Sequence, residues 1–182
     1  ANINWWNEFA GYCESINPDV YLVGEVWQDD KVLENYVQPF DTKFDFAIQQ
    51  KILNCVQKGM AVPGFGDSLS VAIENIHNKY DGVDVNYLNV VFVANHDQDR
   101  IASSVNSLDK ARQIAAVYMT LPGNPYIYYG EELGMYGSKP DEMIRTPFLW
   151  GDDSTYNTSW EKDDQNAETK GLAQQMKDPD SM

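Results

Sequence analysis

The sequence predicts an α/β fold in which parallel strands alternate with helices. Apolar, strand-like runs recur along the chain, and segments with helical apolar spacing separate them. The best-defined run, Val90–Arg100, is rich in β-branched and aromatic residues in its first half and ends in polar ones, among them Asn95, His96 and Asp97. In an α/β barrel the body of such a strand fills the core, and its carboxyl end faces the active-site mouth.

The composition is that of an acidic chain with ample material for a core. Of its 182 residues, 43% are hydrophobic and 13% aromatic, which is enough for one domain of ordinary size. The formal net charge of −15 argues against nucleic acid as a partner and is compatible with a neutral substrate, although acidic charge also serves solubility. No apolar run approaches membrane-spanning length and no signal peptide is recognised, so we expect no membrane partner.

The first half of the chain is expected to alternate helices and strands. Asn4 can cap a first helix, Val20–Trp27 is a strongly apolar strand, and Asp29–Val37 is a weak helix. A short strand within Phe40–Phe46 and a helix over Ala47–Lys58 follow. The apolar face of the first helix comprises Trp5, Trp6, Phe9, Cys13 and Ile16. Cys13 is therefore expected in the core, and the two cysteines of the chain do not make a disulfide framework or a metal site.

The second half continues the same alternation. Asp67 or Ser68 can begin another helix, which leads to the strand at Val90. Ser107 caps a clear amphipathic helix, and Pro125–Tyr129 forms the last strand. This order contains four strands, each expected to be parallel to the next, whereas a closed barrel needs eight. We therefore expect half of a (β/α)8 TIM barrel, with its strands and helices in residues 1–134 and a long loop in residues 135–182. A small doubly wound sheet is the alternative.

Glu25 is the first candidate catalytic residue, since it stands near the carboxyl end of an apolar strand. Burial beside an apolar wall would keep its carboxyl group protonated and suit it to act as a general acid near neutral pH. The alternative is a core glutamate that is paired with a base.

Asp97 and His96 form the second candidate group. Alone, Asp97 could cap a helix, and His96 could be a core histidine, a metal ligand or a donor to a hydroxyl; with only His77 elsewhere, a histidine metal site is not expected. Together with Glu25 they carry more weight, because catalytic residues of barrels come from the ends of different strands on one face. We therefore predict that Asp97 and His96 hold a sugar ring while Glu25 performs acid–base chemistry, with a structural role for both carboxylates as the alternative.

Other catalytic templates are missing from the sequence. Ser103 and Ser104 lack the surroundings of a nucleophile elbow, and the chain has neither a P-loop nor a dinucleotide-binding fingerprint. Four aromatic residues could stack on sugar faces, with core packing as the alternative: Trp27, Tyr128, Tyr129 and Trp150.

Four segments in series carry a resemblance to a known family: Gly24–Trp27, Phe92–Asp97, Gly123–Glu132 and Arg145–Trp150. They look like the fifth-strand, seventh-strand and eighth-strand motifs, and the following Arg-x-Pro-x-x-Trp loop, of the alpha-amylase family of glycoside hydrolases (family thirteen). The order and spacing agree over nearly the whole chain. The resemblance therefore identifies the expected half barrel as strands five to eight with their helices.

This resemblance implies a retaining mechanism on α-linked glucans such as starch and maltooligosaccharides. An aspartate nucleophile attacks the anomeric carbon, and Glu25 would protonate the leaving oxygen and then activate water. Asp97 would grip the 2- and 3-hydroxyls of the distorted ring and stabilise the transition state. The residues that would bind the substrate beside them are Asn95, His96, Trp27 and Arg145.

The family's nucleophile is expected to lie outside this chain. In the family it follows an arginine by two positions, and none of the arginines here has an aspartate at that distance: Arg100, Arg112 and Arg145. We therefore expect strands one to four upstream, together with any calcium site of the parent protein, and no cofactor in this chain. The chain alone is expected to be inactive.

The resemblance leaves several properties of the parent protein open. A glycosidase of the alpha-amylase type is expected, with a transglycosylase or isomerase of the family, or a non-catalytic carbohydrate-binding relative, as alternatives. The half barrel would have open edges at the strands of Val20 and Pro125, which favours a homo-oligomer that covers them. An extracellular parent is slightly favoured over a cytoplasmic one, and the linkage specificity stays open.

Overall fold

The computed structural model describes residues 2–27, 32, 34–58, 65–80, 87–151, 156–158 and 163–182. The chain divides into two units. The first contains Ala1–Val91 and Leu121–Pro125, and the second contains Phe92–Thr120 and Tyr126–Met182.

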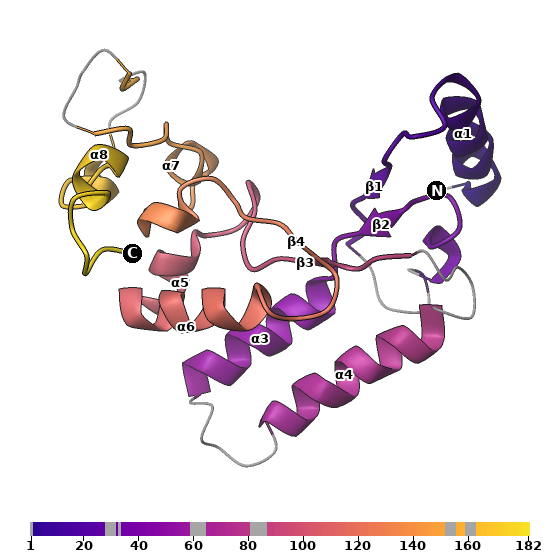
Figure 1. Ribbon diagram of the computed structural model, residues 1–182, viewed down its shortest axis with the longest axis horizontal. Helices are drawn as coiled ribbons and strands as arrows, with labels where there is room; N and C mark the ends of the chain where they lie inside the picture. Colours follow the sequence, from indigo (N-terminus) through magenta and orange to yellow (C-terminus); the bar gives the residue numbers. More distant parts are fainter. Residues whose placement is uncertain are drawn as a thin grey trace. The chain divides into compact units, whose positions relative to one another are not determined.

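Short parallel strands form the centre of the first unit (Figure 1). β1 pairs with β2 and β3 pairs with β4, both in parallel, and a parallel bridge between Phe44 and Val90 links the two pairs. The strands therefore stand side by side in their sequence order, which confirms the parallel arrangement predicted for them. Their bounds are β1 Val23–Gly24, β2 Thr42–Lys43, β3 Val90–Val91 and β4 Asn124–Pro125.

Helices of the first unit follow the predicted order. They are α1 (Ile3–Ile16), α3 (Phe46–Lys58) and α4 (Phe65–Tyr80), with a 3-10 turn η1 at Glu34–Tyr36. α3 and α4 lie side by side (Figure 1). Asp45 joins α3 to the strands, because one carboxylate oxygen accepts from the Ile48 backbone N–H at 2.8 Å and the other from the Asn89 side chain at 2.9 Å. α4 begins earlier than expected, and part of the weak helix expected over Asp29–Val37 lies outside the described residues.

α1 differs from its prediction in its cap and its burial. The side chain of Asn2, and not that of Asn4, caps the helix by accepting from the Asn4 backbone N–H at 3.1 Å. Its apolar face is largely open within the described residues: Trp5 is 52% exposed, Ile16 is 68% exposed and Cys13 is half-buried. The expected core position of Cys13 is therefore wrong, because no described segment of the chain covers this face fully.

Two strand ladders are shorter than the apolar runs that predicted them. Val20–Trp27 pairs only at β1, and the strand expected over Pro125–Tyr129 pairs only at β4. Beyond β4 a side chain of this run contacts a distant segment, because the hydroxyl of Tyr129 donates to the Thr146 carbonyl at 2.8 Å. The apolar first half of the run Val90–Arg100 nevertheless lies in the core, where Phe92, Val93 and Ala94 are buried.

The second unit is built mainly from short helices. They are α5 (Ile101–Val105), α6 (Leu108–Tyr118), η2 (Glu131–Leu133), α7 (Asp141–Ile144), η3 (Asp164–Asn166) and α8 (Leu172–Gln175). Ser107 caps α6 as predicted, and its Oγ accepts from the Lys110 backbone N–H at 3.3 Å. α5 was not predicted, because five residues are too few to show helical spacing. The region 135–182, which was expected to be a long loop, contains the short elements α7, η3 and α8, and these are likewise too short to show helical spacing.

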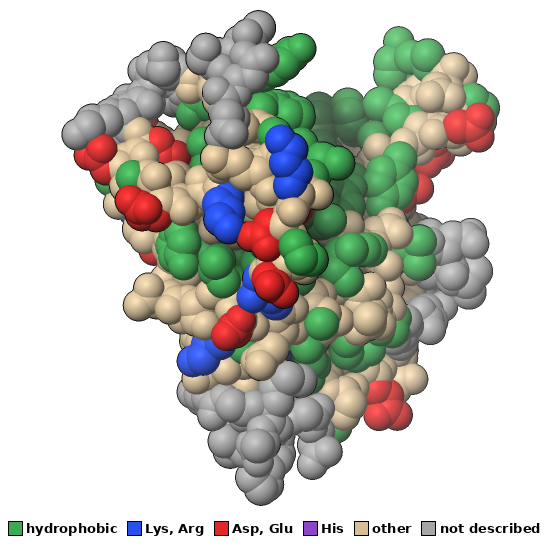
Figure 2. All heavy atoms as spheres, turned by 60° about the vertical axis from the view of Figure 1, so that its left-hand side comes forward, with side chains coloured by type: hydrophobic (Ala, Val, Ile, Leu, Met, Phe, Trp, Pro, Cys, Tyr) green, Lys and Arg blue, Asp and Glu red, His purple; other side chains and the backbone are tan. Residues whose placement is uncertain are grey.

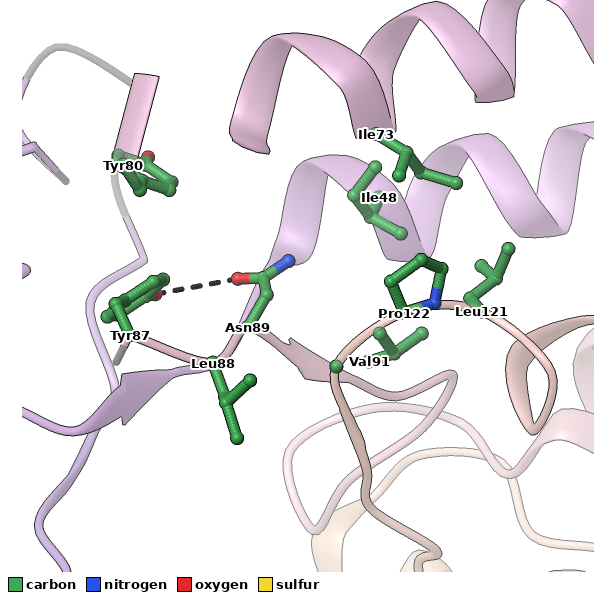
Figure 3. Close-up of a pocket in the computed structure, with 10 residues that line it drawn as sticks. Ile48, Ile73, Tyr80, Tyr87, Leu88, Asn89, Val91, Leu121 and Pro122 are labelled. Atoms are coloured by element: carbon green, nitrogen blue, oxygen red, sulfur yellow. Dashed lines mark hydrogen bonds between the residues drawn. The ribbon is translucent and has the colours of Figure 1, made fainter. Parts of the chain in front are cut away.

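A small cavity of about 40 Å³ lies at the amino ends of β3 and β4 (Figure 3). Ile48 of α3, Ile73 of α4 and Val91 line it. Gly123 borders it with φ at 120°, and a Cβ there would lie 2.4 Å from the Asn89 carbonyl oxygen, so the strands approach each other this closely only because the residue is glycine. Since barrel sites form at the opposite, carboxyl ends of the strands, this cavity belongs to the packing and not to the candidate site. None of the helices in the described part of the chain has the length and apolar character needed to cross a membrane.

Candidate active site

The predicted site residues fall into two groups, one in each unit. Glu25 and Trp27 follow β1 in the first unit. Asn95, His96 and Asp97 follow β3 along the chain and belong to the second unit, as does Arg145 after α7. The sequence predicted the position of each at the end of a strand or in the loop beyond it.

Glu25 is exposed, which corrects the expected burial beside an apolar wall. It borders a hollow of about 430 Å³ whose lining is rich in aromatic side chains, including Trp6, Phe9 and Phe40. The backbone here is tightly packed, because a Cβ on buried Gly24 would lie 3.0 Å from the Phe40 ring. The backbone of β1 is thus packed against Phe40. Because β1 ends just before Glu25, the Glu25 side chain stays accessible to solvent.

Trp27 presents an accessible ring. Its ring stacks on Phe46 at 4.5 Å between centroids and an angle of 12°, and the side chain is 58% exposed. One face of the indole is therefore supported by an aromatic neighbour. This arrangement fits a platform on which a sugar face could stack.

The Asp97 carboxylate has one protein partner for each oxygen. Arg145 Nη2 donates to Oδ1 at 2.7 Å, and His96 Nε2 faces Oδ2 at 3.3 Å. The Asp97 side chain is nevertheless 40% exposed. A carboxylate offers about four lone-pair positions, so about two remain available here for an incoming ligand.

Asn95 shapes the turn that carries Asp97. It is 7% exposed, and its Oδ1 accepts from the Asp97 backbone N–H at 3.0 Å. Its carbonyl accepts from the Gln98 backbone N–H at 3.3 Å. The position after a buried strand therefore continues into a tight Asx turn, which presents His96 and Asp97 toward solvent.

Arg145 links several groups of the second unit. Its Nε donates to the His96 carbonyl at 2.8 Å, and its Nη2 donates to Asp141 Oδ2 at 2.9 Å as well as to Asp97. Lys139 pairs with the other oxygen of Asp141. The hydrogen bond from Lys139, and then the charge of Arg145, lower the pKa of Asp141 below its usual value. Charges of alternating sign thus run from Asp97 to Lys139. Oppositely charged side chains also neighbour one another on the face drawn in Figure 2.

Sequence reasoning missed Lys139, Asp141 and Arg100. The i,i+4 pair of Asp141 and Arg145 would have been visible had the short helix α7 been expected. Arg100 gave no such signal. It is 1% exposed, donates to the Tyr129 carbonyl at 2.6 Å, and its guanidinium lies 4.8 Å from the centre of the Tyr129 ring.

Glu131 is a second missed acid, and it lies in the interior. Burial raises its pKa to about 8, which the neighbouring Glu132 charge reinforces, while the Tyr118 hydroxyl lowers it by donating to Oε2 at 3.1 Å. Among the residues that the structure describes, none forms a hydrogen bond with its Oε1. Glu131 therefore differs from the acids of the candidate site in two ways: its side chain is buried, and the strongest charge effect on its pKa is that of another acid.

Comparison with known proteins places the chain in one family. The family model described as alpha amylase, catalytic domain, matches residues 1–182. "Alpha-amylase 3" of Dictyoglomus thermophilum is 41% identical over 100% of this chain and 36% of its own length. The 4-alpha-glucanotransferase of Thermotoga maritima is 30% identical over 100% of this chain and 40% of its own length.

A solved structure agrees with these sequence relatives. The alpha-amylase from H. orenii superposes with a TM-score of 0.88 at 37% identity, over 99% of this chain and 37% of that one. The chain thus spans well under half of the length of the relatives that it matches. The family match over all its residues, and the relatives just described, show that the chain belongs to the alpha-amylase family of glycoside hydrolases.

Proposed function

We propose that this chain is part of a retaining glycosidase that acts on α-linked glucans such as starch or maltooligosaccharides. One observation carries the proposal: the Asp97 carboxylate is oriented by Arg145 and His96 and is still 40% exposed. Two neighbouring hydroxyls of a sugar ring could use the lone pairs that remain. The family membership of the chain supports the same conclusion.

Within this proposal each predicted residue has a role. Glu25 is the general acid and base, and Asp97 stabilises the transition state through hydroxyls whose hydrogen bonds strengthen during the reaction. The exposure of Glu25 supports its role, because a reacting group must be accessible to substrate. The nucleophile is an aspartate of a segment outside this chain, roughly 5–5.5 Å from Glu25 in the assembled enzyme. The substrate-binding residues are Asn95, His96, Trp27 and Arg145.

The proposal extends to the architecture. Residues 1–134 supply strands five to eight of the parent barrel with their helices, and residues 135–182 form the region after strand eight. The parallel order of β1 to β4 supports this assignment. In the described residues the outer sides of β1 and β4 carry no ladder, and the apolar face of α1 is open, so the isolated chain would self-associate. A stable monomer in light scattering at high concentration would contradict the self-association.

Two measurements test the function. The complete enzyme that contains this segment should release reducing ends from maltoheptaose, and Glu25→Gln should abolish this release. The isolated chain of 182 residues should release none, because no aspartate follows an arginine by two positions in it, as the family's nucleophile does. Cleavage by the pure chain that disappears in Glu25→Gln would overturn the assignment of the nucleophile.

Transfer between glucans is the second candidate, and the similarity to a 4-alpha-glucanotransferase favours it. A transferase would convert maltoheptaose into longer and shorter chains with little net gain of reducing ends, whereas a hydrolase would show a net gain. Any calcium requirement belongs to the parent segments outside this chain. If the parent holds calcium there, chelator treatment should lower the thermal midpoint of the complete enzyme without changing that of the isolated chain.

A further inference from the structure

We infer that Arg145 is a positioning residue for Asp97, and that Tyr128, Tyr129 and Arg100 hold the backbone of Arg145 in place. The inference rests on the proposed function, because it gives the orientation of Asp97 a part in the reaction. It narrows the substrate-binding role proposed for Arg145, because this side chain would act on the sugar through Asp97 and not by a direct contact.

The first support is the direction of the Arg145 donors. Nη2 reaches Asp97 Oδ1 at 2.7 Å, and Nε reaches the carbonyl of His96, the residue directly before Asp97, at 2.8 Å. The planar guanidinium therefore holds both the carboxylate and the backbone next to it. A planar group that binds two points restrains rotation of the carboxylate more strongly than a single charge can.

The second support is another carboxylate, Asp141, which also binds the Arg145 guanidinium. Asp141 accepts from the same Nη2 at 2.9 Å, and Lys139 pairs with the other Asp141 oxygen. Arg145 is thus held between two carboxylates. Because Asp141 is itself held by Lys139, the guanidinium cannot follow Asp97 freely, and Asp97 is fixed relative to α7.

The third support is a backbone clamp around Arg145. The Tyr128 hydroxyl donates to the Ile144 carbonyl at 3.0 Å, and the Tyr129 hydroxyl donates to the Thr146 carbonyl at 2.8 Å. These two carbonyls belong to the residues on either side of Arg145.

Buried Arg100 completes this clamp. It donates to the Tyr129 carbonyl at 2.6 Å and lies 4.9 and 4.8 Å from the centres of the Tyr128 and Tyr129 rings. The two tyrosine hydroxyls are therefore engaged with the chain around Arg145. These contacts favour a supporting role for Tyr128 and Tyr129 over stacking on a sugar.

The consequence for catalysis follows from geometry. Bonds from Asp97 to sugar hydroxyls strengthen in the transition state, so a carboxylate that is free to rotate would lose transition-state binding more than ground-state binding. A misplacement of about 1 Å can cost about 10²-fold in rate. Loss of Arg145 should therefore lower kcat and leave KM nearly unchanged.

A double-mutant cycle in the complete enzyme tests the inference. Arg145→Met should lower kcat on maltoheptaose about 10- to 100-fold, with KM within about 3-fold of wild type. In an Asp97→Asn background the same substitution should change kcat by less than about 2-fold, because Arg145 acts through Asp97. Arg112→Met is the matched control: Arg112 pairs with Asp109 in the same unit, and its loss should leave kcat within about 2-fold.

The outcomes separate the two proposals. Additive effects of Arg145→Met and Asp97→Asn would overturn the positioning role and favour a direct contact of Arg145 with the sugar. Full activity of Arg145→Met would overturn it as well. A wild-type enzyme without α-glucan activity, or with activity unaffected by Glu25→Gln, would overturn the proposed function and the inference with it. If Arg145→Met does not fold, Arg145→Lys replaces it in the same cycle: it keeps the charge, loses the fork, and should lower kcat about 10-fold only when Asp97 is present.

Discussion

Two acids of the second unit, Asp97 and Glu131, have opposite surroundings. Asp97 is 40% exposed and faces the cation of Arg145, whereas Glu131 is 7% exposed and faces the Tyr118 hydroxyl with Glu132 nearby. Burial raises the pKa of Glu131 to about 8. The contrast teaches that the side-chain type did not decide the role of either carboxyl group. Exposure with oriented partners suits Asp97 to bind a ligand, while burial makes Glu131 an interior group that takes up a proton.

The arginines repeat this contrast. Arg145 is 40% exposed, and its guanidinium donates to two carboxylates. Arg100 is 1% exposed, and its guanidinium donates to the Tyr129 backbone carbonyl and lies against two aromatic rings. Removing Arg145 should change catalysis, and removing Arg100 should change the fold around it. Substitutions at the site should therefore lower activity, and substitutions in the interior should lower stability.

Asp97→Asn should cause the largest loss. The amide keeps the shape but loses the charge that pairs with Arg145, and its NH2 group cannot accept hydrogen bonds, so kcat of the complete enzyme should fall about 10²- to 10³-fold. The thermal midpoint should change little, because the side chain is 40% exposed. Kinetics on maltoheptaose with parallel thermal denaturation check both parts; a loss of stability without a loss of kcat would break the comparison with Glu131.

Glu131 should make stability depend on pH. Its folded-state pKa of about 8 lies above the unfolded value of about 4.3, so the folded state holds a proton that the unfolded state releases between these values. The contribution of Glu131 to the free energy of unfolding is therefore greatest below about pH 4 and falls as the pH rises toward about 8, by as much as a few kcal/mol.

Glu131→Gln should flatten this profile between about pH 5 and pH 8, because an amide does not titrate. Urea unfolding at several pH values measures the slope. Asp97→Asn serves as the control and should keep the wild-type slope. Parallel profiles of the wild type and Glu131→Gln would show that Glu131 does not carry the pH dependence.

Tyr118→Phe should be next in size. It removes the hydroxyl that donates to Glu131 Oε2 at 3.1 Å, so this buried carboxyl loses a hydrogen-bond donor. An unsatisfied buried polar group costs about 1–3 kcal/mol. Calorimetry should show the loss, and it should shrink in a Glu131→Gln background if the two side chains are coupled. An equal loss in both backgrounds would assign the effect to packing alone.

Asp141→Asn should have the smallest effect. Its charge holds Arg145 from the side opposite Asp97, and Lys139 and Arg145 keep its pKa low, so the charge is present throughout the neutral range. We expect kcat of the complete enzyme to fall about 2- to 5-fold with an unchanged thermal midpoint, since exposed ion pairs contribute little to stability. An effect as large as that of Arg145→Met would make Asp141 a direct participant and would change the positioning scheme.

Some elements were predictable because their signals are local. Ser107 and the apolar spacing after it identified α6, and the alternation of apolar runs with helices predicted the parallel strand order. Elements of three to five residues, such as α5 and α7, carry no periodic pattern and were missed. The ends of strands were also misjudged, because a ladder requires a backbone partner in register, and an apolar run does not specify where that partner ends.

The sequence by itself determined where the candidate residues stand: Glu25 and Asp97 at the ends of apolar strands, within motifs of the alpha-amylase family. Strand character and motif spacing depend on residues that are close together in the sequence. Only the tertiary structure decided that Glu25 is exposed, that Glu131 takes up a proton, and that Arg145 holds Asp97 from 48 residues away. Burial and ionic partnership arise between segments that are distant in the chain, and the physical state of a charged group depends on them more than on its sequence neighbours.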